Sequence, residues 1–215
     1  LILVGDSMAN VLYNMKNTHQ ITLENIIQHG ISVRKGIKKS LMVVDMPKGT
    51  YNTSIQAKKN AKIILKKTKC DAVKIECNGK NYKIITSLIK AEVPVMGHIG
   101  YTPQLKKKFK VEGKNNKEEK KLINEAILTE KAGAFSIVLE CVIPNVAKKI
   151  TNTINIPTIG IGSSKYCDGD LRLLWDVSKN GHVRSTSYNK SANVTTDTSM
   201  GFNGVSDSRY STLWQ

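Results

Sequence analysis

Charged and polar side chains that could take part in catalysis follow short apolar runs of this sequence, where buried strands would end. They are Asp6, Asp45, Lys74, Glu76, His98 and Glu140. Carboxylates gathered at one place repel one another, and they stay ionised together only beside a cation. Oxygen ligands favour Mg²⁺ or Mn²⁺ over Zn²⁺. The pattern therefore predicts a metal-assisted site, provided that the fold brings the ends of these runs together.

Apolar runs rich in Val, Ile and Leu alternate along the chain with segments of helical periodicity. The runs are Leu1–Val4, Leu41–Val44, Ala72–Ile75, Val93–Met96, Phe135–Leu139, Pro157–Ile161 and Leu171–Trp175. They lack polar alternation, which is typical of parallel strands buried on both faces. The helices expected between them are 23–37 after a Thr22 cap, 54–68 with Ser54 as the cap, 81–91, 118–132 before Gly133, and 146–154 entered through Pro144.

Strands separated by helices of this length indicate repeated βαβ units. The pattern favours a (β/α)₈ barrel over an open doubly wound sheet, although it does not decide between them. In a barrel the active site lies at the carboxyl ends of the strands, where the charged residues fall. Lys74 and Glu76 stand two residues apart on one strand, so both should point to the interior while Ile75 faces the helices.

Each of these residues also has an ordinary structural interpretation. An aspartate directly after a strand is often a helix cap or a turn residue, which applies to Asp6 and Asp45. The Lys-x-Glu pair could form a structural ion pair, since an unpaired buried charge is costly. His98 could be a core or capping histidine, and Glu140 a solvent-facing strand end. Their shared position at strand ends favours a functional site over five separate structural roles.

Composition excludes several classes of protein. The 215 residues have a formal net charge of +16 and are 40% hydrophobic, which indicates a globular chain. The lysines are scattered and aromatic residues make up only 6%, so we expect solvated surfaces and no nucleic-acid partner. No apolar run is long enough for a membrane helix. The four cysteines form no C-x-x-C pair and are interpreted as reduced cytosolic thiols.

Six ordered blocks of this sequence resemble the ketopantoate hydroxymethyltransferase family. They are Val4–Ser7, Val44–Pro47, Val73–Glu76, Val95–Gln104, Ile137–Val142 and Pro157–Gly162, followed by Cys167–Gly169 before the last run. The block MGHIGYTPQ and the block LECV are the most specific. The resemblance covers residues 1–177, which we interpret as the catalytic barrel domain. Residues 178–215 are rich in Ser, Thr, Asn and Gly, and we expect them to form an irregular, atypical tail.

The resemblance implies an activity and a set of functional residues. The family transfers a hydroxymethyl group from 5,10-methylenetetrahydrofolate to 3-methyl-2-oxobutanoate, which gives 2-dehydropantoate for pantothenate and coenzyme A synthesis through an enolate stabilised by Mg²⁺. The matching residues are Asp6, Asp45 and Glu76 for the metal, Asp6, Ser7, Asp45, Lys74 and His98 for the keto acid, and Glu140 as the general base. The family also implies a cytoplasmic homo-oligomer, often a decamer, without a membrane partner.

Two alternatives remain open at this point. The chain could be another Mg²⁺-dependent C–C lyase or a phosphonomutase-type barrel, against which the Met96–Gln104 and Glu140–Val142 blocks argue. It could also be an inactive remnant of the family or a basic binding protein. The family's first strand and helix would precede Leu1, so we expect seven of the eight barrel strands within this chain.

Overall fold

A computed structural model of the protein describes residues 1–77, 79, 81–106 and 108–172. The predicted tail, 178–215, lies outside the described residues, as do residues 173–175 of the last apolar run. Within the described part of the chain, no helix combines the length and the apolar character that a membrane crossing requires.

The fold is built on one curled, parallel sheet of seven strands. The strands are β1 (Ile2–Val4), β2 (Met42–Asp45), β3 (Ala72–Glu76), β4 (Val95–Gly100), β5 (Ser136–Glu140), β6 (Thr158–Ile161) and β7 (Gly169–Asp170). Each strand pairs in parallel with its neighbour in sequence, from β1 to β7. A doubly wound sheet reverses its strand order at a switch point. The sequential order therefore excludes that alternative and agrees with the winding of a barrel.

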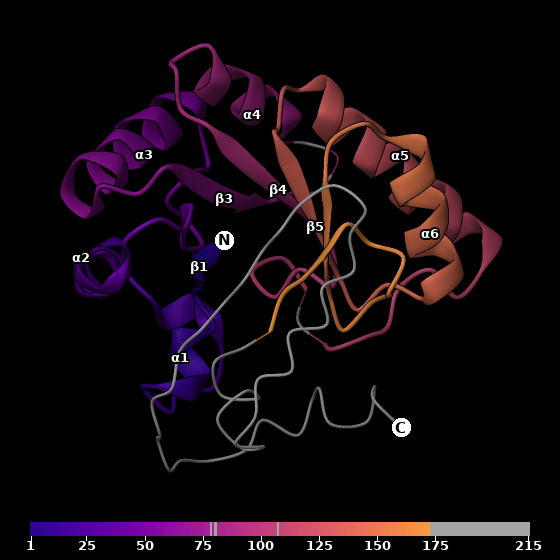
Figure 1. The fold of residues 1–215 in the computed structure, drawn as a ribbon, viewed down its shortest axis with the longest axis horizontal. Coiled ribbons are helices and arrows are strands. Elements are labelled where there is room, and N and C mark those ends of the chain that lie inside the picture. The colour runs from indigo at the N-terminus through magenta and orange to yellow at the C-terminus, as the bar shows by residue number, and fades with distance from the viewer. Residues whose placement is uncertain (78, 80, 107, 173–215) are drawn as a thin grey trace.

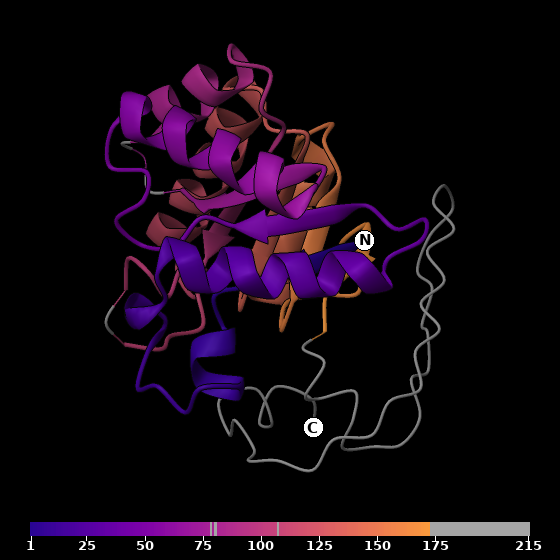
Figure 2. The same cartoon turned by 90° about the vertical axis from the view of Figure 1, so that its left-hand side faces the viewer.

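Helices cover the outer, convex side of this sheet (Figure 1). They are α2 (Leu23–Gly36), α3 (Ser54–Thr68), α4 (Tyr82–Ile89), α5 (Asn116–Lys131) and α6 (Pro144–Thr153). The helix α1 (Met8–Val11) and the short 3₁₀ helix η1 (Thr18–Gln20) follow β1 and lie outside this layer. From α2 to α6 they form an arc, and a view from the side shows α2 and α3 packed next to each other (Figure 2). All the helices expected from periodicity are present.

Capping side chains set where these helices begin. Thr22 caps α2 as expected, because its hydroxyl accepts a hydrogen bond from the Asn25 amide while the Asn25 side chain bonds back to the Thr22 backbone. The expected cap of α3 was one residue too late: Thr53 accepts from the backbone of that helix, and Ser54 is its first residue. The start of α5 is likewise earlier than expected, because Asn115 supplies the cap.

The seventh strand differs from its prediction. We expected Leu171–Trp175, but β7 is Gly169–Asp170, paired with Ile159 and Gly160 of β6. The preceding Asp168 carboxylate accepts hydrogen bonds from the backbone and the hydroxyl of Thr158, at 2.9 and 3.0 Å, which draws this segment against β6. The prediction from apolar character alone therefore started the strand too far along the chain. The hydrogen bonds of Asp168 to Thr158 bring the preceding residues against β6, and pairing starts there.

Alternate side chains of the strands enter two different cores. One core lies between the sheet and its helices and contains residues such as Val44, Val73, Ile75 and Leu139. The position of Ile75 confirms the expected direction of this side chain. A second core fills the concave side of the sheet and consists of Val43, Ala72, Met96, Val138 and Ile161, with partly buried neighbours. Such interior layers of apolar side chains are typical of βα barrels.

The pleat of the strands places polar residues directly above this inner core. Asp45 follows Val43 by two residues, Lys74 follows Ala72, His98 follows Met96 and Glu140 follows Val138. Because side chains two apart on a strand share a face, all four polar groups point to the concave side at the carboxyl ends of the strands. The pleat of the strands thus directs these four groups to the same side of the sheet.

Candidate active site

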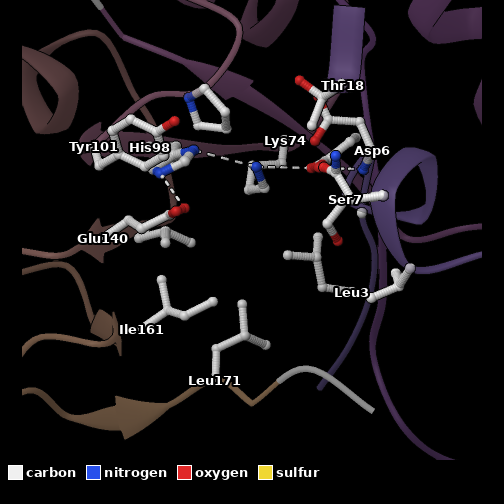
Figure 3. Close-up of a pocket in the computed structure, with 16 residues that line it drawn as sticks. Leu3, Asp6, Ser7, Thr18, Lys74, His98, Tyr101, Glu140, Ile161 and Leu171 are labelled. Carbon is white, nitrogen blue, oxygen red and sulfur yellow. Dashed lines mark hydrogen bonds and ion pairs between the residues drawn. The ribbon is translucent and has the colours of Figure 1, made fainter. Parts of the chain in front are cut away.

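A pocket opens on the concave side of the sheet at the carboxyl ends of its strands (Figure 3). Its polar lining includes six residues predicted from the sequence, which are Asp6, Ser7, Asp45, Lys74, His98 and Glu140. Strand register sets Asp45 directly opposite Lys74, whereas His98 lies opposite Glu76 and Glu140 lies opposite Gly100, so the polar groups step along successive strands. Leu3, Val138, Ile161 and Leu171 form the apolar floor and wall.

These polar side chains form one continuous chain across the pocket (Figure 3). The Asp6 backbone N–H donates to Asp45 Oδ2 at 3.0 Å, and Asp45 Oδ1 pairs with Lys74 Nζ at 2.9 Å. Lys74 Nζ lies 3.3 Å from His98 Nδ1, and His98 Nε2 lies 3.1 Å from Glu140 Oε2. One end of the chain is a pair of carboxylates and the other is a single carboxylate, with a cation and an imidazole between them.

Lys74 is the central positive charge of this site. Burial alone would lower the pKa of its ammonium, but the charges of Asp45, Asp6 and Glu76 outweigh burial and raise the pKa above its usual range. Only 6% of its side chain is exposed. Lys74 therefore remains an ammonium at neutral pH. Because it is buried, solvent screens its charge only weakly, and it attracts any anion that enters the pocket.

His98 is held as a neutral imidazole. Complete burial lowers its pKa, and the neighbouring Lys74 ammonium lowers it further, while contact with Glu140 acts in the opposite direction. The partners of the ring then assign its tautomer: Nδ1 accepts from Lys74, and the proton sits on Nε2, facing Glu140. The histidine thus links the cation to the third carboxylate without adding a charge of its own.

Two carboxylates at the other end of the pocket fit a divalent cation. Burial raises the pKa of Asp6 to about 7, and the nearby Asp45 carboxylate raises it in the same direction. A bound cation would offset this cost of ionisation. Within the described residues, no three His, Cys, Asp or Glu side chains converge as a ready cluster. Mg²⁺ is nevertheless commonly held by one or two carboxylates, with water and substrate completing its shell.

Glu76 lies apart from the pocket lining. Both of its carboxylate oxygens accept from the backbone N–H of Gln104, at 3.1 and 3.0 Å, and 1% of the residue is exposed. Burial raises its pKa well above the usual value, against the opposing effect of Lys74. Its Oε1 also lies 3.9 Å from His98 Nδ1, so this acid contacts the site through Gln104 and His98 without lining the pocket.

The ordinary structural interpretations do not describe these residues. Asp6 binds Gln104 through its carboxylate and caps no helix, and Ser7 at the start of α1 makes no side-chain cap either. Lys74 pairs with Asp45 and not with Glu76. Glu140 is buried and faces His98. Each group is directed at the pocket or at another member of the site.

The sequence interpretation missed other residues of the site. Asn10, Thr18, Tyr101 and Pro103 also line the pocket, and Gln104 holds Asp6 from behind. Tyr101, Pro103 and Gln104 belong to the same MGHIGYTPQ block that indicated the resemblance, so the signal was present without a role attached. Their roles depend on loops that lie far apart in sequence, which periodicity does not detect.

Fold and site together define a TIM-type α/β protein with an acidic and basic pocket at the carboxyl ends of its strands. The fold is similar to a crystal structure of 2,3-dimethylmalate lyase, described as a PEP mutase/isocitrate lyase superfamily member. That likeness has a TM-score of 0.54 and covers 73% of this chain and 56% of that chain, at 12% identity. At this identity it shows the fold alone.

Sequence comparison identifies the family. A family model described as ketopantoate hydroxymethyltransferase matches residues 1–203, so the match runs past the domain boundary expected at residue 177. The 3-methyl-2-oxobutanoate hydroxymethyltransferase of Pelagibacter ubique is 48% identical over 194 residues, 90% of this chain and 76% of that protein. The Clostridium botulinum (strain 657) protein of the same name is 47% identical over 180 residues. These residues are 82% of this chain and 66% of that protein. The chain belongs to the ketopantoate hydroxymethyltransferase family.

Proposed function

We propose that this protein transfers a hydroxymethyl group from 5,10-methylenetetrahydrofolate to 3-methyl-2-oxobutanoate, giving 2-dehydropantoate and tetrahydrofolate. In the reaction the C3–H bond of the keto acid breaks and a new C–C bond forms to the folate methylene carbon. Both bonds from that carbon to the folate nitrogens break, water supplies the hydroxyl oxygen, and the two nitrogens take up one proton each, balancing those released from C3 and from water. The observation that supports this most is the polar chain across the pocket. It sets a carboxylate base opposite a pair of carboxylates, with a buried ammonium between them.

The keto acid would bind through its two oxygen-bearing groups. Its carboxylate and keto oxygen both attract positive charge, and Lys74 supplies a buried ammonium at the centre of the pocket. Ser7 lines the same pocket, and its hydroxyl can donate to the substrate carboxylate. The apolar wall of Leu3, Val138 and Ile161 suits the isopropyl end of the substrate.

Glu140 is the proposed general base for the C3 proton. Its carboxylate lines the pocket on the opposite side from Asp6 (Figure 3). His98 Nε2 lies 3.1 Å from one oxygen of this carboxylate, which places the imidazole directly beside the proposed base. General base catalysis of this kind contributes about 10²–10⁴-fold. The carbanion that results is conjugated with the keto group, so its charge develops on the oxygen near Lys74.

Asp6 and Asp45 are the proposed ligands of Mg²⁺. Mg²⁺, when bound, supplies Lewis-acid stabilisation of the negative charge that develops on the keto oxygen. Glu76, also expected as a metal ligand, faces the main chain of Gln104 and lies outside the pocket lining, so we propose that it acts from behind the direct ligands.

The larger assembly follows the family expectation. We propose a closed (β/α)₈ barrel in which one further strand stands between β7 and β1; within the described residues those two strands each pair with a single neighbour. A cytoplasmic homo-oligomer, with methylenetetrahydrofolate as co-substrate and no nucleic-acid or membrane partner, belongs to the same proposal.

Exchange of the C3 proton of 3-methyl-2-oxobutanoate in D₂O, followed by NMR, tests this function without the folate step. We expect exchange that requires both Mg²⁺ and Glu140, and a loss of about 10²–10⁴-fold in Glu140→Gln. This variant keeps the shape of the side chain and is expected to fold. The folding control is that its circular dichroism spectrum matches that of the wild type. Equal exchange by the wild type and Glu140→Gln would contradict the assigned base.

A further inference from the structure

A buried glutamine lies behind the two carboxylates, at the meeting point of three loops. Gln104 follows β4 and is 2% exposed. Its side-chain Nε2 donates to Asp6 Oδ2 at 2.8 Å and to the Met46 carbonyl at 3.0 Å. Its Oε1 accepts a hydrogen bond from the Tyr51 hydroxyl at 2.6 Å. Its backbone N–H donates to both carboxylate oxygens of Glu76. One residue therefore contacts both the pocket acid and the acid behind it.

The side-chain amide has a single possible orientation. Its two N–H donors face two acceptors, and its oxygen faces a hydroxyl donor. A flipped amide would set its oxygen against the Asp6 carboxylate and the Met46 carbonyl, leaving buried acceptors without donors, which is costly. Burial raises the pKa of Tyr51 far above its usual range, and Glu76 adds to that effect, so the hydroxyl keeps its proton and continues to donate.

A neutral donor is well suited to this position. Lys74 already pairs with Asp45, and a second ammonium on the other side of Asp6 would compete further with a metal for negative charge. An amide fixes one carboxylate oxygen and adds no charge to the group. The backbone N–H of Asp6 is fixed in turn by Asp45 Oδ2. Both the main chain and the side chain of Asp6 are thus held before any ligand arrives.

We propose that Gln104, locked by Tyr51, is a positioning residue that holds the Asp6 carboxylate in its metal-binding orientation and couples it to Glu76. This inference rests on the proposed Mg²⁺ site. Gln104 does not touch the substrate, and it acts through the carboxylate that it orients. Groups behind metal ligands change metal affinity by about 10–100-fold when they are removed.

Metal binding in the absence of substrate tests this directly. Mn²⁺ titration followed by electron paramagnetic resonance measures affinity without turnover. In Gln104→Met, which keeps the length but loses both donors, we expect Mn²⁺ to bind about 10–100-fold more weakly. In Tyr51→Phe, which keeps the ring and frees the amide to rotate, we expect weakening of about 2–10-fold. Tyr51→Phe also decides the question if Gln104→Met does not fold.

A buried substitution far from the site separates positioning from general destabilisation. Ile85 in α4 is fully buried in the outer core, and Ile85→Val should lower the melting temperature with no change in Mn²⁺ affinity. Wild-type affinity in both Gln104→Met and Tyr51→Phe would overturn the inference. Absence of Mn²⁺ binding by the wild type would overturn it together with the metal part of the proposed function. Weakened Mn²⁺ binding with no C3 exchange by the wild type would uphold the inference and contradict the function alone.

Discussion

The concave side of the sheet has two levels with opposite chemistry. The lower level is the inner core of Val43, Ala72, Met96, Val138 and Ile161, and the upper level is the pocket. The same strands build both, and each polar side chain stands two positions after the apolar one below it, with a single residue between them. The lower level gains stability by removing apolar surface from water, whereas the upper level buries charges at a cost that mutual pairing offsets. On these strands the inner-core residues therefore contribute stability, and the residues two positions further along form the pocket.

The largest effect is expected at the centre of the upper level. Lys74→Met removes the ammonium and leaves the buried Asp45 and Asp6 carboxylates without their partner. Breaking a buried ion pair from one side typically costs about 3–5 kcal/mol, which urea denaturation would measure. The double variant Lys74→Met/Asp45→Asn should recover part of this loss, because the orphaned charge is gone. A single variant as stable as the wild type would contradict the assigned pairing.

A truncation in the lower level should change stability without changing chemistry. Met96→Ala opens a cavity in the inner core and is expected to cost about 2–5 kcal/mol of unfolding free energy. Met96→Leu, which nearly conserves volume, should cost less than about 1.5 kcal/mol. C3 exchange per folded molecule should stay near the wild-type rate in both. A selective loss of exchange in Met96→Leu would show that the two levels are not separable.

Gly100 at the end of β4 pairs with Glu140 at the end of β5, and the two backbones lie very close together. Gly100 has φ +92°, and an added Cβ would meet the Glu140 carbonyl oxygen at 2.2 Å. Gly100→Ala is expected to cost at least about 1–3 kcal/mol through backbone strain and to reduce exchange by shifting the base. Gly36→Ala, in α2 with open space around its Cβ, is the matched control and should be neutral or stabilising. Equal effects of the two substitutions would refute a special role for Gly100.

The smallest effect concerns the metal. Free Mg²⁺ at ten times its dissociation constant should stabilise the protein by about 1.4 kcal/mol, because it binds only the folded state. Asp45→Asn should abolish this gain, and it should also lower the stability of the metal-free protein because Lys74 loses its partner. Thermal denaturation with and without Mg²⁺ measures the difference, and Ca²⁺ in place of Mg²⁺ serves as a test of selectivity. An unchanged response in Asp45→Asn would remove this residue from the metal site.

Local features account for the parts of the fold that were predictable. The hydrophobic periodicity of 23–37 and the Thr22 cap suffice to predict α2, since both depend on neighbours within a few residues. The observed elements differ from the predicted ones where a contact between residues distant in sequence sets their position. The anchor of Asp168 on Thr158 moves β7 toward the N-terminus, which the apolar run at Leu171 could not indicate. The choice between a singly and a doubly wound sheet likewise required strand pairing.

The same division applies to the site. Residue types and their positions after apolar runs were enough to predict that Asp45, Lys74, His98 and Glu140 gather at the carboxyl ends of the strands. The two-residue period was enough to place Lys74 and Glu76 on one face of their strand. Only the tertiary structure decided that Lys74 pairs with Asp45, that Glu76 lies behind the pocket and that Gln104 orients Asp6. Those contacts join residues up to 98 positions apart in sequence, and their geometry depends on how the sheet curls.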